Sequence, residues 1–119
     1  SSDMREIEKA DSEGNERAHL ALQMYNYRIK KYIGEYAAAM GGVDIIVWTA
    51  GVGENQEDVR WDSCQGLEFL GIKMDKEANH CRGVERVISA PDSKVKVCLI
   101  PTDEEIVIAR DTMELVAKK

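Results

Sequence analysis

The segment best suited to chemistry is a glycine-containing turn in the middle of the chain. Residues 49–56 (TAGVGENQ) directly follow the apolar run 45–48 and precede a stretch compatible with a helix. A strand that leads through a glycine turn into a helix presents backbone N–H groups to a phosphate. Gly51 and Gly53 suit this task because a side chain would block close approach and because such turns often require positive φ. The pattern favours phosphate or nucleotide binding.

The glycine turn is a weak signal when it stands alone. It lacks the third glycine of a dinucleotide-binding fingerprint, and the chain contains no Gly-Lys-Ser or Gly-Lys-Thr sequence of a P-loop. A plain strand-to-helix turn, with Asn55 capping the helix, is equally compatible with these residues. The function of the turn therefore depends on what the fold brings next to it.

A second candidate is acidic and lies near the end of the chain. Asp103, Glu104 and Glu105 follow Pro101 and Thr102, directly after an apolar segment typical of a strand. Carboxylates at such a point can hold hydrated Mg²⁺ together with phosphate oxygens. The alternative, favoured on the residues alone, is a capping box of Thr102 and Glu105 in an acidic first turn that complements the helix dipole.

The two candidates meet if the strands that precede them are neighbours. Residues 44–51 and 94–101 each end in a polar loop, and ligands of open α/β sheets bind at the carboxyl ends of strands. Pairing of these strands would bring residues 51–55 and Glu104 to one crevice. We therefore expect one ligand site at this edge of the sheet.

The elements that must position these loops follow from hydrophobic periodicity. Residues 16–40 carry apolar side chains at helical spacing, with Asn15 as a plausible N-cap and Gly41–Gly42 as the stop. The continuous apolar run at 45–49 is typical of a strand buried on both faces. A last helix is predicted to start near Thr102. Its inner face would consist of Ile106, Ala109, Met113 and Val116.

Shorter elements complete the predicted domain. Helices are expected at residues 3–10 and 55–66, and extended segments at 67–74, broken by Gly71, and at 86–90 and 94–100. Three tyrosines in the long helix are expected to pack rather than to stack on a ligand: Tyr25, Tyr32 and Tyr36. The alternation of helices and strands predicts an α/β domain, in which a sheet is flanked by helices.

Composition limits the classes of partner. The 119 residues suit one domain, and the formal net charge of −6 argues against nucleic acid as a partner. No apolar run approaches the ~20 residues of a membrane span, and there is no signal-peptide pattern. Three cysteines without CxxC spacing favour reduced thiols in the cytoplasm. His80 and Cys81 are expected to be a surface histidine and a half-buried thiol rather than zinc ligands.

Several phrases of the sequence together resemble the C-terminal region of acetate kinases. The resemblance covers essentially the whole chain, in order and without large gaps. The phrases that carry it are residues 1–5 (SSDMR), 15–18 (NERA), 43–55 (VDIIVWTAGVGEN), 66–72 (GLEFLGI), 92–97 (DSKVKV) and 100–105 (IPTDEE). Small departures are Trp48 where Phe is familiar, Val52 where Ile is common and Asp103 where Asn is usual.

The resemblance implies a fold and a set of site residues. The fold is a partial ASKHA (ribonuclease H-like, actin-like) C-terminal domain spanning residues 1–119. Glu104 would be the carboxylate associated with Mg²⁺ or Mn²⁺, and the extra charge of Asp103 could alter the metal preference. The residues implied to contact ATP or ADP are Asp3, Met4 and Arg5 on the nucleoside side, and Gly51, Val52, Gly53, Glu54 and Asn55 around adenosine and phosphates.

The resemblance also implies an activity that this chain does not carry alone. Acetate kinases transfer a phosphoryl group between ATP and acetate, giving acetyl phosphate and ADP. Their acetate pocket and catalytic residues lie upstream of the region that matches, so no catalytic residue is expected here and the isolated chain is expected to be inactive. A homodimer is expected. Propionate or butyrate kinase, and a non-catalytic interaction module of the same fold, remain alternatives.

Overall fold

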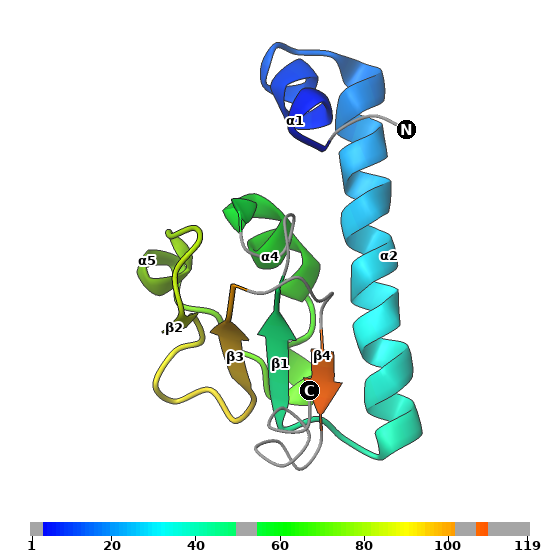
Figure 1. The fold of residues 1–119 in the computed structure, drawn as a ribbon. Helices are drawn as coiled ribbons and strands as arrows, with labels where there is room; N and C mark the ends of the chain where they lie inside the picture. Colours follow the sequence, from blue (N-terminus) through cyan, green and yellow to red (C-terminus); the bar gives the residue numbers. More distant parts are fainter. Residues whose placement is uncertain (1–3, 50–54, 102–106, 110–119) are drawn as a thin grey trace.

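A small mixed sheet forms the centre of the molecule (Figure 1). The computed structural model describes residues 4–49, 55–101 and 107–109. In that part of the chain, four strands are hydrogen-bonded in the order β2-β3-β1-β4. β1 is parallel to β3, whereas β4 pairs with β1 and β2 with β3 in antiparallel fashion. The strands are β1 (Ile45–Trp48), β2 (Arg86–Val87), β3 (Lys96–Leu99) and β4 (Val107–Ala109).

Helices lie beside the sheet and at one end of it. The long helix α2 runs along the β4 side and also contacts α4, while α1 packs against the start of α2 (Figure 1). The α/β arrangement predicted from the sequence, a sheet flanked by helices, is confirmed. The helices are α1 (Met4–Ser12), α2 (Glu16–Met40), α4 (Glu57–Cys64), the 3₁₀ turn η1 (Glu68–Leu70) and α5 (Lys76–Asn79).

The long helix α2 begins and ends as its sequence predicts. The Asn15 side chain accepts a hydrogen bond from the Ala18 N–H at 3.0 Å, which satisfies one of the free donors of the first turn. At the other end Gly41 adopts the left-handed conformation with φ 77°, and its N–H bonds back to carbonyls of the last turn. Both predicted caps are confirmed.

Strand β1 is buried along its whole length because the sheet is covered on both faces. Side chains alternate across a strand, so Ile46 and Trp48 point to one face, where they join Ile33 of α2 and the rest of the main core. Ile45 and Val47 form a smaller cluster on the other face. All four β1 side chains are buried, as the continuous apolar run predicted.

The prediction of a last helix is wrong at residues 107–109, the part of that segment that the structure describes. Residues Val107–Ala109 form strand β4, which pairs with β1, so Ala109 does not belong to a helical apolar face. Val107 and Ile108 are β-branched and suit a strand, and β1 is buried and needs a hydrogen-bond partner along its second edge. The capping box at Thr102, and the rest of the predicted helix, lie outside the described residues.

Two smaller expectations are also corrected. The predicted break at Gly71 is present, but the residues before it form η1 rather than an extended segment; after it, isolated bridges pair Ile72 with Val95 and Met74 with Ser89. Tyr25 packs against the core as expected. Tyr32 and Tyr36 are instead 42% and 43% exposed and contact each other, with ring centroids 4.6 Å apart. The apolar side chains at helical spacing thus extend beyond the face of α2 that is buried in the core.

The three cysteines are free, as the sequence predicted. Burial raises the pKa of the Cys64 thiol to about 12, which keeps this core side chain protonated at neutral pH. His80 is exposed and Cys81 is half-buried, as predicted for a surface histidine and a half-buried thiol.

We predict opposite effects of alanine at two glycines. Gly71 has φ +98°, and a Cβ there would lie 3.0 Å from the Lys94 Cβ, so Gly71→Ala should lower the free energy of unfolding by about 1–3 kcal/mol. Gly34 lies inside α2 with open space around it, so Gly34→Ala should raise that free energy by about 0.5–1 kcal/mol. Urea unfolding of both variants measures the difference. Equal stability of Gly71→Ala and the unsubstituted chain would contradict the assigned backbone conformation.

Candidate functional site

The carboxyl ends of β1 and β3 lie side by side, as the sequence analysis predicted. Trp48 is in register with Leu99, and the Ile100 N–H donates to the Trp48 carbonyl at 3.0 Å. β1 continues into the buried residue Thr49, and β3 into the half-buried Pro101. The two segments singled out as ligand loops therefore begin from neighbouring strand ends.

Most of the predicted ligand residues lie outside the described part of the chain. This applies to Asp3, to Gly51, Val52, Gly53 and Glu54, and to Glu104. A common crevice for residues 51–55 and Glu104 therefore stays a prediction. Of the remaining candidates, Met4 begins α1, Arg5 is exposed in its first turn, and Asn55 is half-buried two residues before α4.

Side chains of α1 face the start of α4 across a hollow. Arg5 and Glu8 of α1 line a hollow of about 460 Å³ together with Asp58 in the first turn of α4. The Gln56 side chain, with its amide nitrogen turned toward α1, donates to Glu8 Oε2 at 2.7 Å. The two parts of the chain implied to contact a nucleotide thus adjoin helices that border one hollow.

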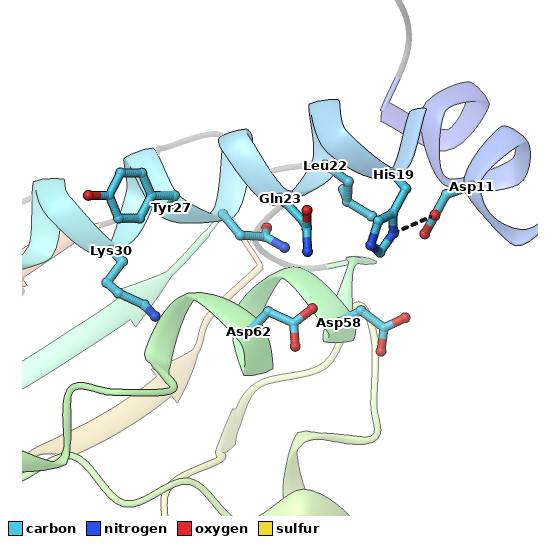
Figure 2. Close-up of a pocket in the computed structure, with 9 residues that line it drawn as sticks. Asp11, His19, Leu22, Gln23, Tyr27, Lys30, Asp58 and Asp62 are labelled. Atoms are coloured by element: carbon cyan, nitrogen blue, oxygen red, sulfur yellow. Dashed lines mark hydrogen bonds and ion pairs between the residues drawn. The ribbon is translucent and has the colours of Figure 1, made fainter. Parts of the chain in front are cut away.

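A second hollow lies between α2 and α4 and is closed by α1 at one end (Figure 2). We call it the α2–α4 groove; its volume is about 550 Å³. His19 contacts Asp11 across the α1–α2 corner, with Nδ1 and Oδ1 2.8 Å apart. The groove is lined by Asp11, His19, Leu22, Gln23, Asn26, Tyr27, Lys30, Asp58 and Asp62.

Negative charge dominates the α2–α4 groove. Burial raises the pKa of Asp62, the nearby Asp58 raises it further, and Lys30 opposes the shift. Glu8 lines the neighbouring hollow rather than the groove, and its pKa is likewise raised by burial and by Asp58 and Asp11. These carboxylates repel one another, so the groove is unfavourable for the phosphates of a nucleotide.

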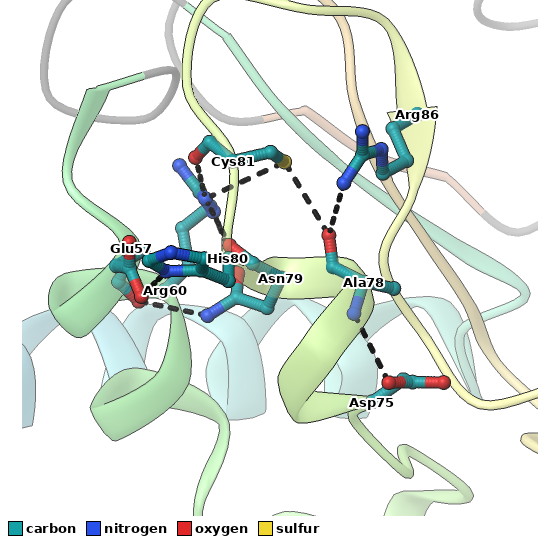
Figure 3. A network of polar contacts seen from close by, with 8 residues as sticks. All are labelled: Glu57, Arg60, Asp75, Ala78, Asn79, His80, Cys81 and Arg86. Carbon is teal, nitrogen blue, oxygen red and sulfur yellow. Dashed lines mark hydrogen bonds and ion pairs between the residues drawn. The ribbon is translucent and has the colours of Figure 1, made fainter.

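A buried arginine ties α4 to the turn after α5 (Figure 3). Arg60 is 0% exposed; its Nε donates to Asn79 Oδ1 at 2.8 Å, and its Nη2 donates to the carbonyls of Asn79 and Cys81 at 2.7 and 2.6 Å. Burial lowers the pKa of Arg60, while Cys81 and Glu57 oppose this shift. The Asn79 Nδ2 donates to the Glu57 carbonyl at 3.0 Å, which completes the link to the first turn of α4.

Neither Arg60 nor Asn79 was predicted from the sequence as a functional or structural residue. Arg60 adjoins Val59 in a short helix, and no spacing signal connects it with a residue 19 positions later. Within the described ranges, no group of three or more His, Cys, Asp or Glu side chains is arranged to hold a metal ion. No helix in that part of the chain is long and apolar enough to span a membrane.

Known proteins similar to this chain are acetate and propionate kinases. The acetokinase family matches residues 1–110. An acetate kinase of Phocaeicola vulgatus is 62% identical over 99% of this chain, and one of Thermotoga maritima is 60% identical over 99%. The chain spans about 30% of the length of these relatives.

Solved structures agree with these sequence relatives. The crystal structure of Porphyromonas gingivalis acetate kinase is 60% identical and superposes with a TM-score of 0.83, covering 87% of this chain and 26% of that one. A propionate kinase from Francisella tularensis is 30% identical, with a TM-score of 0.74 over 87% of this chain and 26% of that one. The chain has the ASKHA fold of these kinases, and it belongs to the acetokinase family.

Proposed function

We propose that residues 1–119 are the nucleotide-binding C-terminal part of an acetate kinase. The observation that carries this proposal is the parallel pairing of β1 with β3. The carboxyl ends of these two strands are therefore neighbours, and residues 50–54 and 102–106 each follow one of these strand ends in the sequence. Ligands of open α/β sheets bind at such an edge. Identity of about 60% to acetate kinases supports the same assignment.

Each candidate residue has a role in this proposal that its chemistry supports. Backbone N–H groups of the turn Gly51–Asn55 would bind phosphate oxygens, and residues 3–5 would contact the nucleoside. Glu104 supplies the hard carboxylate oxygen that Mg²⁺ accepts alongside phosphate oxygens and water. The metal, when bound, neutralises charge on the phosphates during transfer.

The activity proposed for the whole protein is transfer of a phosphoryl group between ATP and acetate. Such transfer depends on positioning and on charges placed around the transferring group. Half of a cleft does not supply them, so we propose that this chain alone binds nucleotide without turning it over. A homodimer in the cytoplasm is the proposed state of the full-length protein.

A propionate kinase is the second candidate. Its support is the likeness to the Francisella tularensis propionate kinase, which is lower in identity than the likeness to acetate kinases. The acyl group would bind in the part that relatives have and this chain does not span, so acetate remains the better-supported substrate.

We predict that the chain binds ATP in the presence of Mg²⁺ and that Glu104→Gln weakens this binding. Loss of one carboxylate contact to the metal should cost about 1–3 kcal/mol, or about 5- to 150-fold in Kd. Isothermal titration of the unsubstituted chain and the variant measures the change.

The matched control for this titration is Glu77→Gln, which makes the same change of charge on the exposed face of α5. Its Kd for ATP should stay unchanged. Equal ATP affinity of Glu104→Gln and Glu77→Gln, in chains shown to be folded, would contradict the assigned metal carboxylate.

We predict that Arg60→Lys both destabilises the chain and weakens nucleotide binding. Lysine keeps the charge, but a single ammonium group cannot reproduce the planar fork that serves Asn79 and Cys81. The free energy of unfolding should fall by about 1–3 kcal/mol, because buried acceptors lose their donors. Urea unfolding and ATP titration at low temperature measure the two effects.

The exposed Arg82 provides the control, since Arg82→Lys leaves the buried contacts intact. ATP affinity should fall because the hydrogen bonds of Arg60 fix α4, which follows the predicted nucleotide-binding turn. An Arg60→Lys variant that loses stability but keeps full ATP affinity would contradict this positioning role of Arg60.

A further inference from the structure

A side-chain hydrogen bond joins the two segments for which nucleotide contacts are proposed. Gln56, directly before α4, donates from its amide to the carboxylate of Glu8 on α1, with 2.7 Å to Oε2. Both side chains are half-buried. Glu8 lies about one helical turn after Met4 and Arg5, and Gln56 directly follows Asn55. The pair therefore connects the segment assigned to the nucleoside with the end of the turn assigned to adenosine and phosphates.

The side chain of Gln56 is committed to this contact rather than to its own helix. Gln56 occupies the N-cap position of α4, but its side chain makes no capping hydrogen bond there. Its amide is directed to Glu8 instead, next to a hollow of about 460 Å³ that separates α1 from Asp58 of α4. The start of α4 is thus held from α1 by a contact between side chains.

The carboxylate of Glu8 lies among other acidic groups. Burial raises its pKa, and the charges of Asp58 and Asp11 raise it further. A carboxyl group with a raised pKa binds its proton more tightly in this arrangement than it would with α1 separated from α4. Protonation of Glu8 therefore stabilises the arrangement, and its effect grows as the pH falls. The charged or titratable side chains around the hollow are Arg5, Lys9 and Asp11 from α1, Asp58 from α4, and His19 of α2, which contacts Asp11.

An amide can pair with either form of a carboxyl group. Its N–H donates to a carboxylate, and its carbonyl accepts from the O–H of a carboxylic acid, so a half-turn of the Gln56 amide keeps the hydrogen bond. We propose that Glu8 and Gln56 are positioning residues that hold the start of α1 in place relative to Asn55, and that a proton on Glu8 tightens this arrangement around a bound nucleotide. This role depends on the nucleotide binding proposed above for the same two segments.

The pH dependence of ATP binding tests this role. Glutamine resembles a protonated glutamate and can still pair with Gln56, so at pH 8 Glu8→Gln should bind Mg²⁺-ATP about two- to fivefold more tightly than the unsubstituted chain. The difference should disappear as the pH falls toward about 5, where Glu8 itself gains a proton. Glu6→Gln makes the same change of charge at an exposed position of α1 and should keep the pH dependence of the unsubstituted chain.

An exchange of the two side chains separates positioning from a loss of stability. Gln56→Glu brings two carboxylates together and should weaken ATP binding at least about fivefold at pH 8. Glu8→Gln added to the same chain restores one amide and one carboxylate with their places exchanged. The affinity should then return to within about twofold of the unsubstituted chain, whereas two unrelated defects would not rescue each other.

Resonances of the ligand-free chain distinguish this role from the proposed function. The side-chain amide of Gln56 and the backbone amide of Asn55 should shift together with pH, with a midpoint above the usual range for glutamate, and Glu8→Gln should abolish both shifts. If these shifts occur but the folded chain does not bind ATP, the coupling is confirmed and the nucleotide-binding role is overturned. The coupling is overturned by an unchanged pH dependence of ATP binding in Glu8→Gln, by an exchange that rescues nothing, or by shifts that persist in Glu8→Gln.

Discussion

The parallel pairing of β1 with β3 is the constraint on which the rest of the structure depends. β1 is buried on both faces, so its backbone polar groups must be paired along both edges, and β3 and β4 provide this pairing. Neighbouring parallel strands have their carboxyl ends on the same side of the sheet. Any ligand site formed by residues 50–54 and 102–106 therefore begins from the same two neighbouring strand ends.

Helix α4 is fixed by contacts on three sides. Arg60 holds it to the turn after α5 through buried hydrogen bonds, α2 packs against it, and Gln56 links its start to Glu8 of α1. A short helix has little stability of its own, so these tertiary contacts must supply it. These contacts hold the start of α4 in place. Phosphate binding by backbone N–H groups at the start of a helix requires such preorganised donors.

Local signals in the sequence predicted the elements that depend on local physics. The caps at Asn15 and Gly41, the buried strand β1 and the β1–β3 neighbourhood were predicted and are confirmed. β4 was missed because helical spacing in residues 102–116 competed with strand pairing, which depends on a partner 60 positions away in the chain. Arg60 and Asn79 were missed for the same reason: their contact is long-range and leaves no spacing signal.

The central claim is that residues 51–55 and 103–105 share one metal–nucleotide ligand. Paramagnetic broadening of backbone amide resonances by Mn²⁺-ATP tests it most directly, with Mg²⁺-ATP as the diamagnetic reference. We expect selective broadening in both segments at once. Broadening confined to one segment, or concentrated at Asp58 and Asp62 of the α2–α4 groove, would contradict it.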